Sequence, residues 1–491
     1  MTDTTFAYHQ AIALADLPVY EAEAFAEKLG SCLAQGLRLL CLTALAREAE
    51  KTSLLAVFTN DATQKLTAFC AKPLTSLPSL ADSYPSVQLF ERELFEDYGV
   101  KFPGHPWLKP VRQTPDNTPQ RYPFFRTDGR EVHEVAVGPV HAGIIEPGHF
   151  RFQCFGENVL NLEIALGYQH RGLEQCLLQA KPSARLPLLE CAAGDTSIGH
   201  ALAHAVLMER LTGLTVSDRS WHLRRLALEL ERLANHIGDL GAIAGDTGFL
   251  PTSSWNGRIR GDVLTMTAIL TGNRFGRGHI AVGGVHNDLD AELCADLIHR
   301  LDFARRDALG SVKVMLTSES VLDRLRTTGT VSLKDAKALG LVGVCAKAAG
   351  VVCDARLTAP LRPGQNFIPA KCETGDVLAR VLVREEEMRA SFAMVEDDLC
   401  ALEEGSPEER GYAPSPILPT GMLAVAQVEG FRGEIVHLAV TNEHSGFQVY
   451  KVIDPSFHNW QGLAMALRDN QISDFPLCNK SFNLSYCGYD L

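Results

Sequence analysis

The sequence lacks the long apolar runs that would place it across a membrane. No stretch reaches the roughly 18 uncharged apolar residues that a spanning helix needs. The first ten residues, MTDTTFAYHQ, contain no basic segment followed by an apolar one, which is the pattern of a secretory signal. We therefore expect a cytoplasmic chain that meets a membrane only through partner subunits.

An excess of positive charge is missing too. The 46 Lys and Arg residues stand against 59 Asp and Glu, which gives a net charge of −13. Phosphate binding needs a basic surface, and no Lys/Arg-rich run supplies one locally. We therefore expect no nucleic-acid partner.

Cysteines are numerous, but they lack the spacing of a metal site. The chain has 13 of them, and disulfides rarely persist in the cytosol, so metal or cluster ligation is the first use to test. No Cys-x-x-Cys pair occurs anywhere in the sequence. We therefore assign no metal ligands and expect most of these thiols to be small buried hydrophobes.

The glycine pattern of a nucleotide-binding loop is also absent. Gly194 and the pair Gly283–Gly284 do not lie in a strand-to-helix Gly-x-Gly-x-x-Gly context. We interpret them as turns and predict no NAD site on this chain.

What remains is the composition of a folded protein, for which we predict an α+β fold. The 491 residues are enough for about three domains, and 46% of them are apolar. Residues 1–110 predict a small α/β domain with a helix near Val19–Leu29 and strands within Leu37–Leu45, Ser53–Phe58 and Lys65–Ala71. Prolines are crowded into the stretch that follows, and because proline fixes φ and removes a donor, 111–134 is predicted to be an extended linker.

Residues 135–491 predict a mainly helical domain with peripheral β hairpins. A hairpin is expected over Val135–Phe155 with its turn near Glu146–Gly148, and β-like alternation returns over Ala424–Val452. Apolar residues between Leu223 and Leu240 step by three and four, which predicts a helix whose charged residues, such as Arg224 and Arg232, mostly face away from the core. Further helices are predicted over Leu188–Leu211, Arg258–Leu270, Asp288–Met315 and Thr374–Cys400.

Several strings are too specific for composition to explain. Phe90–Val100 (FERELFEDYGV) and Phe102–Pro106 (FPGHP) resemble the signature of the C-type subunit of NADH:quinone oxidoreductase, complex I. Gly138–Gly143 (GPVHAG), Glu146–Phe150 (EPGHF) and Leu166–Glu174 (LGYQHRGLE) resemble the D-type subunit, a relative of the large subunit of nickel–iron hydrogenases. The order, C-type then D-type, is similar to the fused large subunit of membrane-bound group 4 hydrogenases such as hydrogenase-4 and formate hydrogenlyase. The resemblance covers most of residues 85–491 and implies a hydrogenase-large-subunit-like fold for the second domain.

In those hydrogenases, two Cys-x-x-Cys pairs hold nickel and iron, because soft sulfur ligands suit these metals. The positions that match the first pair are Ala193 and Thr196, and those that match the second are Ser485 and Gly488. Cys191 lies outside the pair in this register. We therefore expect no nickel–iron centre in this chain.

Complex I uses the corresponding cavity for quinone, so the resemblance leaves quinone binding open. In that family, a Tyr in the segment matching Ala192–Thr196 and a His in the region matching His141–His149 contact the quinone head group. This sequence keeps both histidines, but it has no Tyr over Leu188–Leu211.

Four residues are candidates for a catalytic site. His141 and His149 lie in a Gly/Pro-rich hairpin, where imidazole titrates near neutral pH; the alternative is that they hydrogen-bond the turn backbone. Glu146 matches a Glu-x-Gly-His pattern that lies near the metal in the hydrogenases and passes protons there; the alternative is a solvated turn carboxylate. Asp195 lies in the ligand loop, where it replaces the metal with a polar network; the alternative is a helix N-cap or a turn carboxylate.

Two further pairs of residues have a role implied by type or position. His170 and Arg171 occupy a His-Arg-Gly string that, by resemblance, faces the iron–sulfur cluster of an adjacent small subunit. A cation there would raise the cluster's potential, because reduction adds negative charge; the alternative is a surface salt bridge with Glu174. His200 and His204 share a helix face as a metal pair would, but no third ligand lies nearby in sequence, so we expect core or interface packing.

Together these observations predict a peripheral-arm subunit of a complex I/hydrogenase-4-like oxidoreductase. The resemblance implies an iron–sulfur small subunit and membrane antiporter-like subunits as partners, a location on the inner face of the cell membrane, and electron transfer coupled to ion movement. The alternative is a non-redox scaffold that kept the fold and lost the electron acceptor.

Overall fold

An antiparallel sheet near the N-terminus accounts for the first set of predicted strands. In the computed structural model, which describes residues 4–112, 122–143, 145–361, 367–405 and 417–491, its strand order is β1-β6-β5-β4, with β3 parallel to β6. The predicted strands are confirmed, whereas the predicted helix near Val19 begins only at Ala22, because Val19–Tyr20 pairs with Cys70–Ala71. The elements are β1 Thr5–Ala7, β3 Val19–Tyr20, α1 Ala22–Ala34, β4 Arg38–Glu48, β5 Lys51–Asn60, β6 Lys65–Leu74 and α2 Gln88–Tyr98.

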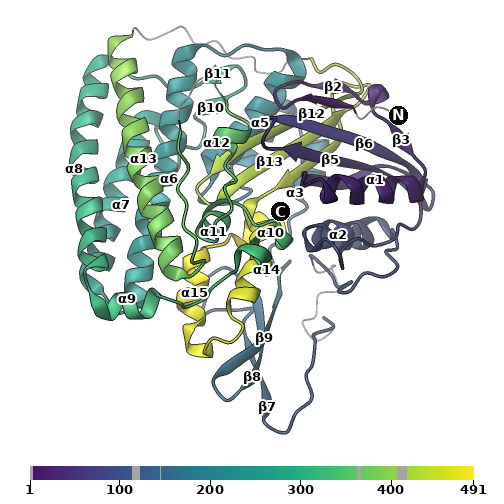
Figure 1. The fold of residues 1–491 in the computed structure, drawn as a ribbon. Coiled ribbons are helices and arrows are strands. Elements are labelled where there is room, and N and C mark those ends of the chain that lie inside the picture. Colours follow the sequence, from purple (N-terminus) through teal and green to yellow (C-terminus); the bar gives the residue numbers. More distant parts are fainter. Residues whose placement is uncertain (1–3, 113–121, 144, 362–366, 406–416) are drawn as a thin grey trace.

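A second sheet joins the two ends of the sequence. Its order is β14-β13-β12-β2, and the short strand β2 places Ile12 opposite Leu423 and Ala13 opposite Met422. Every residue of β13 is buried, because helix α5 covers one side of the sheet and the N-terminal sheet lies close to its far edge (Figure 1). The strands are β2 Ile12–Ala13, β12 Met422–Gly430, β13 Gly433–Thr441 and β14 Phe447–Ile453.

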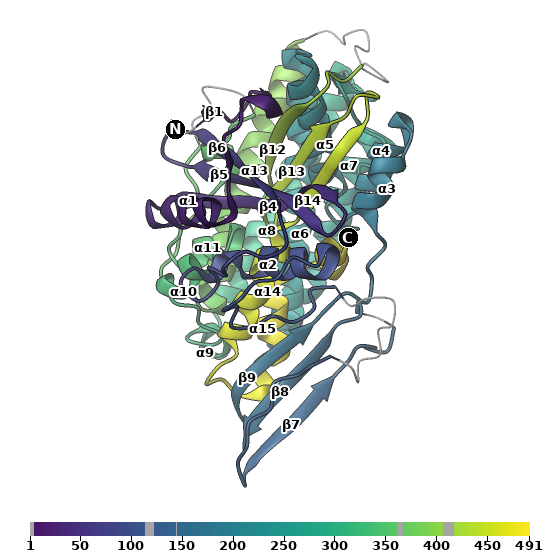
Figure 2. The ribbon, with the colours of Figure 1, turned by 90° about the vertical axis from the view of Figure 1, so that its right-hand side faces the viewer.

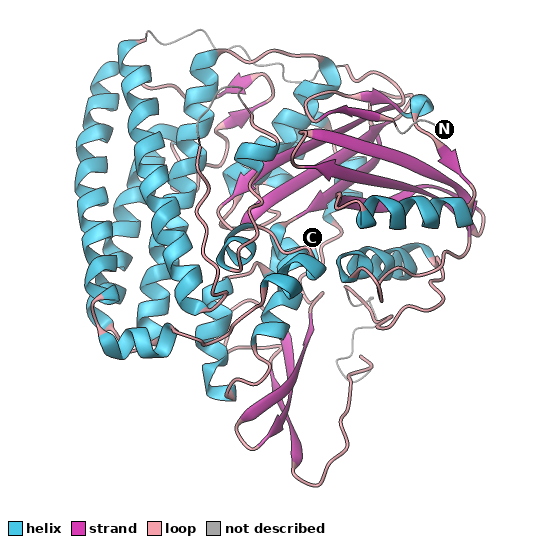
Figure 3. Cartoon of the chain, in the orientation of Figure 1, coloured by secondary structure: helices cyan, strands magenta, loops and turns pink. Residues whose placement is uncertain are grey.

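Long helices stack on one side of this sheet, as Figures 1 and 3 show. Helix α6 packs against α7 and α13, and α8 packs against both of these. The predicted helices are confirmed, except that the one expected over Leu188–Leu211 is interrupted by the loop 190–196. The long helices are α5 Ser197–Thr212, α6 Asp218–Asp246, α7 Leu250–Thr271, α8 Ala291–Leu316 and α13 Val377–Glu404. Within the described residues, no helix combines the length and apolar character of a membrane span.

Shorter elements connect these layers. They are the helices α3 Leu173–Gln179, α4 Pro182–Leu189, α9 Glu319–Leu325, α10 Leu333–Leu339, α11 Gly343–Ala348, α12 Ala355–Thr358, α14 Pro455–Ala466, α15 Phe475–Phe482 and α16 Tyr486–Asp490, and the strands β10 Ile280–Ala281 and β11 Gly284–Val285. Within the described residues, single turns of 3₁₀ helix lie at Leu14–Asp16, Pro85–Val87 and Ile472–Asp474.

A three-stranded sheet projects from the body of the molecule (Figure 2). It consists of β7 Val132–Val137, β8 His149–Phe155 and β9 Asn158–Ala165 in that order. The predicted hairpin is therefore confirmed, although residues 138–143 and 145–148 form a longer connection than a tight turn. Of the predicted linker 111–134, the described residues before Val132 form neither helix nor strand, and 113–121 lie outside the described residues.

The charged residues of α6 contradict the expectation that they face away from the core. Arg224, Glu229 and Arg232 are all buried, because α6 is enclosed by other helices and leaves little of its surface to solvent. Their charges are paired within the interior: Arg224 binds Glu209 at 2.6 Å, and Arg232 binds Glu229 at 3.0 Å. The helix is thus amphipathic in sequence but buried on both faces.

A buried lysine shows how strongly this interior depends on charge pairing. Lys347 in α11 is fully buried, and its Nζ donates to Glu387 at 2.7 Å, to Glu429 at 3.0 Å and to Asp354. Three elements, α12, α13 and β12, are therefore connected through one ammonium group. Removing one member of a buried ion pair leaves the remaining charges uncompensated, which costs much more than losing a surface pair.

We predict that Lys347→Met lowers the free energy of unfolding by about 3–5 kcal/mol. The matched control is Lys337→Met on the exposed face of α10, which should change it by less than about 0.5 kcal/mol. Urea unfolding of both variants measures the difference. Equal stabilities would show that the Lys347 cluster does not hold these elements together.

Candidate functional site

Two chain segments meet where the resemblance expects metal ligands: the loop Cys191–Thr196 before α5 and the tail Asn483–Gly488 before and within α16. The guanidinium group of Arg171 joins them. It donates to the carbonyl of Cys191 at 2.7 Å and to that of Ala192 at 3.0 Å, both in the loop, and to that of Cys487 at 3.2 Å in the tail. One exposed arginine therefore fixes the spacing of the two segments. We call Asp195, Thr196, Arg432, Ser485 and Cys487 the central site.

A second arginine makes the same connection from the inside. Arg432, in the turn between β12 and β13, binds the two carboxylate oxygens of Asp195 at 2.6 and 2.7 Å and donates to the carbonyl of Asn483. Burial opposes ionisation of Asp195, but the Arg432 charge and its hydrogen bonds hold the pKa of this carboxyl below its ordinary value. Asp195 is therefore ionised and part of a polar network rather than a helix cap.

The thiol of Cys487 lies in an environment that keeps it protonated. Its Sγ is 3.4 Å from Ser485 Oγ and also close to Glu146 and the backbone of Gly194. Burial, followed by the negative charge of Glu146, raises the pKa of Cys487 to about 11. A cysteine binds a metal as its thiolate, so binding here would require this thiol to lose its proton.

The four positions that match the hydrogenase cysteines offer one hydroxyl from each segment and no thiolate. Ala193 and Gly488 have no donor side chain, and Thr196 and Ser485 are hard oxygen donors. A β-carbon at Gly488 would lie 2.7 Å from Asp454 Cγ, so a cysteine there would clash with that carboxyl. Among the described residues, no group of three or more His, Cys, Asp or Glu is arranged to hold a metal ion. The donor set at these positions does not fit a nickel–iron centre.

The hairpin histidines are directed to backbone groups. His141 Nε2 lies 2.9 Å from the carbonyl oxygen of Gly148, and His149 Nδ1 lies 3.2 Å from that of Gly138. Burial, partly offset by this contact with Gly138, lowers the pKa of His149, whose Nε2 is buried without a partner. The histidines thus hold the loop between β7 and β8 closed, and that loop adjoins the tail through the close contact between Gly148 and Tyr486. Their predicted proton chemistry stays a prediction.

The segment around His170 is hydrogen-bonded to the C-terminal helix α16. Asp490 accepts from the backbone N–H of Gly167 at 2.7 Å and of Gln169 at 2.8 Å, and its carbonyl lies 2.7 Å from His170 Nδ1. Glu174 pairs with Lys451 at 3.0 Å, so the alternative of a surface salt bridge between this string and Glu174 is not realised. His170 and Arg171 are both exposed, and His170 lines a groove together with Lys451. Their predicted position beside a partner's cluster is compatible with this exposure.

His200 and His204 belong to the core, as predicted. Both are buried on the face of α5 that covers the second sheet. His200 Nε2 lies 3.2 Å from Asp454 Oδ2, and His204 Nδ1 lies 2.7 Å from the Tyr450 hydroxyl. They do not converge on a common point as a metal pair would.

Sequence reasoning missed the partners that shape this region, namely Arg432, Asp454, His437 and Glu231. Glu231 in α6 accepts from the backbone N–H of Ile198 at 2.7 Å and of Gly199 at 3.1 Å, the first turn of α5. The available signals were weak: His437 stands out only as a polar residue within an apolar strand, and Asp454 as a helix cap before a proline.

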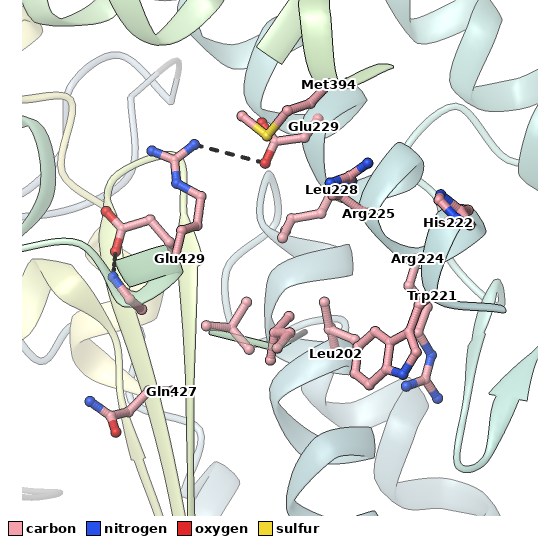
Figure 4. A pocket seen from close by; sticks show the side chains of 14 residues that line it. Leu202, Trp221, His222, Arg224, Arg225, Leu228, Glu229, Met394, Gln427 and Glu429 are labelled. Atoms are coloured by element: carbon pink, nitrogen blue, oxygen red, sulfur yellow. Dashed lines mark hydrogen bonds and ion pairs between the residues drawn. The ribbon is translucent and has the colours of Figure 1, made fainter. Parts of the chain in front are cut away.

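An enclosed pocket lies apart from the central site, between α6 and β12 (Figure 4). Leu202, Leu228 and Met394 form its apolar wall, and Arg225 and Glu229 lie near its edge. An ion pair of 3.8 Å between Arg356 and Glu229 crosses it. None of the six predicted site residues lines this pocket.

Glu231 gives the site a measurable pH dependence. Burial, only partly offset by its two backbone hydrogen bonds, raises the pKa of Glu231 to about 8 from 4.5. Between these values the native protein keeps a proton that the unfolded chain releases, so its contribution to stability is complete at low pH and is lost as the pH rises to about 8.

We therefore predict that the free energy of unfolding of Glu231→Gln, minus that of the wild type, increases by more than about 1 kcal/mol from pH 5 to pH 9. The reason is that the variant has no carboxyl group whose contribution is lost over this range. Urea unfolding at several pH values measures this gain. The exposed residue Glu50 supplies the control Glu50→Gln, whose stability relative to the wild type should stay constant. A constant difference for Glu231→Gln as well would contradict the raised pKa.

Comparisons with known proteins agree with this geometry. Residues 22–128 match the family model of the respiratory-chain NADH dehydrogenase 30 Kd subunit, and residues 246–420 match that of the 49 Kd subunit. The chain is 30% identical to the carbon monoxide-induced hydrogenase of Rhodospirillum rubrum over 72% of its own length and 97% of that protein. It is 28% identical to formate hydrogenlyase subunit 5 of Escherichia coli K12, covering 83% of this chain and 76% of that one.

A solved structure has the same fold. A chain of the membrane-bound sulfane sulfur reductase, an archaeal respiratory membrane complex, aligns with a TM-score of 0.67 at 22% identity. The match covers 74% of this chain and all of that one. The α+β architecture, with a β-rich first part and a mainly helical second part, is therefore confirmed.

Proposed function

The chain belongs to the family that comprises the 30 kDa and 49 kDa subunits of respiratory NADH dehydrogenase, here fused, and the large subunits of the related hydrogenases, and we propose from this that it is a peripheral-arm subunit of a membrane-bound oxidoreductase complex. In this proposal it transfers no hydride itself. It supports electron transfer from an adjacent iron–sulfur subunit, and that transfer is coupled to ion movement through antiporter-like membrane subunits.

The observation that carries this proposal is the position of Arg171. Its side chain is exposed, yet it binds the carbonyl groups of both the loop and the tail of the central site. The positive charge of Arg171 would therefore act electrostatically both on a redox group of a partner docked at this surface and on the central site beneath it. A cation beside a cluster stabilises the reduced form, because reduction adds negative charge.

The finer part of the proposal is that the complex works without a nickel–iron centre in this chain. It rests on the donors at the four matching positions and on the Arg432–Asp195 pair, which supplies opposite charges where thiolates and metal ions would otherwise balance each other. Quinone is the acceptor that the family offers instead. The absence of a Tyr over residues 188–211 means that a quinone head group here would need a donor different from that of complex I.

A non-redox scaffold is the second candidate function. It is favoured by the same Arg432–Asp195 pair, because a closed salt bridge also stabilises a fold that has lost its chemistry. The two functions differ in whether electrons leave the complex through this chain.

We predict that the intact complex, purified from its native membrane through a tag on this chain, contains iron–sulfur clusters and no stoichiometric nickel. Reduced clusters should reoxidise when a quinone is added. Elemental analysis and electron paramagnetic resonance measure both properties. Stoichiometric nickel would refute the metal-free central site, and a complex with no clusters and no electron flux would establish the scaffold.

We also predict that Arg171→Met, in the intact complex, lowers the midpoint potential of the nearest cluster, because a positive charge is removed. Arg171→Lys should restore much of that potential. Arg300→Met, at an exposed position of α8, is the control and should leave the midpoint potential unchanged. Redox titration followed by electron paramagnetic resonance measures the potentials, and an unaltered potential in an assembled Arg171→Met complex would contradict the position assigned to this arginine.

A further inference from the structure

A continuous row of hydrogen bonds runs through the core behind the central site. Asp454 Oδ2 lies 3.2 Å from His200 Nε2, and His200 Nδ1 lies 3.1 Å from His437 Nε2. On the far side of that ring, His437 Nδ1 lies 2.9 Å from the Tyr450 hydroxyl, which lies 2.7 Å from His204 Nδ1. His200 and His437 thus use one ring nitrogen on each side, His204 ends the row with its Nδ1, and no link exceeds hydrogen-bond distance.

These five side chains come from four elements and are all buried. His200 and His204 come from α5, His437 from β13, Tyr450 from β14, and Asp454 from the N-terminus of α14. A row of four consecutive links between proton-exchanging groups is the arrangement that lets a proton shift from end to end.

The positions of the hydrogens follow from the carboxylate. Burial opposes ionisation of Asp454, but the hydrogen bond from His200 and the Arg432 charge hold its pKa below the ordinary value. An ionised carboxylate only accepts, so His200 donates from Nε2 and, when it carries one ring hydrogen, accepts at Nδ1 from His437. His437 must then accept from Tyr450, and Tyr450 from His204 Nδ1. Every donor in the row therefore points toward Asp454.

The ends of the row lie in different places. His204 lines a pocket between α4, α5 and β10 together with Glu190, and the exposed residues Pro187 and Gly278 lie at its edge. At the other end, Asp454 caps α14 by accepting from Ser456 N–H at 2.8 Å, and it lies against Gly488 in the tail. The row therefore connects a surface pocket with the central site.

We propose that Asp454, His200, His437, Tyr450 and His204 form a proton relay between this pocket and the central site. A proton that binds His204 Nε2 releases the hydrogen on Nδ1 to the Tyr450 oxygen. The hydroxyl hydrogen of Tyr450 then moves to His437 Nδ1, and the hydrogen on His437 Nε2 moves to His200 Nδ1. One proton has entered, and one positive charge now stands on His200 beside the Asp454 carboxylate. The three links between His204 and His200 have reversed, while His200 Nε2 still donates to Asp454.

The surroundings of the relay disfavour a positive charge on His204 and His437. Burial and the nearby charge of Arg185, from α4, lower the pKa of His204 to about 3. Burial, with His200 and His204 as neighbours, also lowers the pKa of His437 well below its ordinary value. At the inner end, Arg432 faces Asp454. A proton is therefore unstable on His204 and His437, whereas at the inner end of the row the Asp454 carboxylate lies within hydrogen-bond distance of His200.

The reversal of the links is the property to test, and the full-length chain suffices. With ¹⁵N-labelled histidine, nuclear magnetic resonance distinguishes a hydrogen on Nδ1 from one on Nε2. At neutral pH we expect His204 to carry its hydrogen on Nδ1 and His437 on Nε2. On acidification both should exchange positions at the pH at which His200 gains its second hydrogen.

Tyr450→Phe keeps the shape of the side chain and removes the central link. In this variant His204 should no longer change when His200 is protonated, whereas in the control Tyr8→Phe, which loses only a 2.8 Å bond to the Pro360 carbonyl, the joint change should persist. If Tyr450→Phe fails to fold, the wild-type titration decides alone. A wild-type chain in which His437 and His204 keep their first arrangement until acid unfolding would overturn the relay.

The use of these protons rests on the proposed function, so a second measurement addresses it separately. In the intact complex, Tyr450→Phe should slow electron flux to quinone roughly tenfold or more, with cluster content and potentials unchanged. Unchanged flux would show that the reaction does not draw on the relay. A complex without any flux would refute the proposed function, and the ring-hydrogen titration would still decide whether the relay exists.

Discussion

The pairing of Arg432 with Asp195 is the interaction on which the centre of this protein depends. It fixes the loop before α5, and through the Asn483 carbonyl it also fixes the tail before α16. Arg171 repeats the connection at the surface. Two guanidinium groups thus do by hydrogen bonding what shared metal ligation does in a metalloprotein: they hold two distant chain segments at a set separation. A planar guanidinium suits this task, because its donors have fixed directions and its charge is permanent.

Burying these charged groups has an unfavourable free energy, which other interactions of the structure have to offset. Buried charges lose hydration, and their mutual attraction compensates only when the geometry is good and the remaining polar atoms are bonded. The interior contains several such sets: Lys347 with three carboxylates, Arg224 with Glu209, and Arg232 with Glu229. A core built this way tolerates few rearrangements, since moving one helix would separate several charge pairs at once. Positional precision rather than maximal stability is what such an interior provides.

Much of the fold could be predicted from the sequence, because its signals are local. The residue pattern identified the long strands of both large sheets but not the short strands β1, β2 and β3, and three–four spacing identified α6. The failures came from tertiary context. The charges of α6 are arranged as on a solvated helix, but neighbouring helices enclose them, and nothing local distinguishes an arginine that meets water from one that meets Glu209. The break at 190–196 depends on Arg432 and Glu231, which lie far away in sequence. The motifs located Glu146, Arg171 and Asp195 near the central site, whereas His437 and Asp454 are significant only through neighbours that the fold supplies.

The second sheet also constrains how the protein is made. Strand β2, close to the start of the chain, completes a sheet whose other strands lie near its end, with Ile12 paired to Leu423. During synthesis the ribosome must deliver almost the whole polypeptide before this edge can close, and contacts so distant in sequence form slowly because the intervening loop has to be ordered first. Until then Met422 and Leu423, at the start of β12, lack their partner strand, and an unpaired strand edge is where a nascent chain is prone to associate with the wrong strand. The pairing of β2 with β12 can therefore form only after β12 has been synthesised.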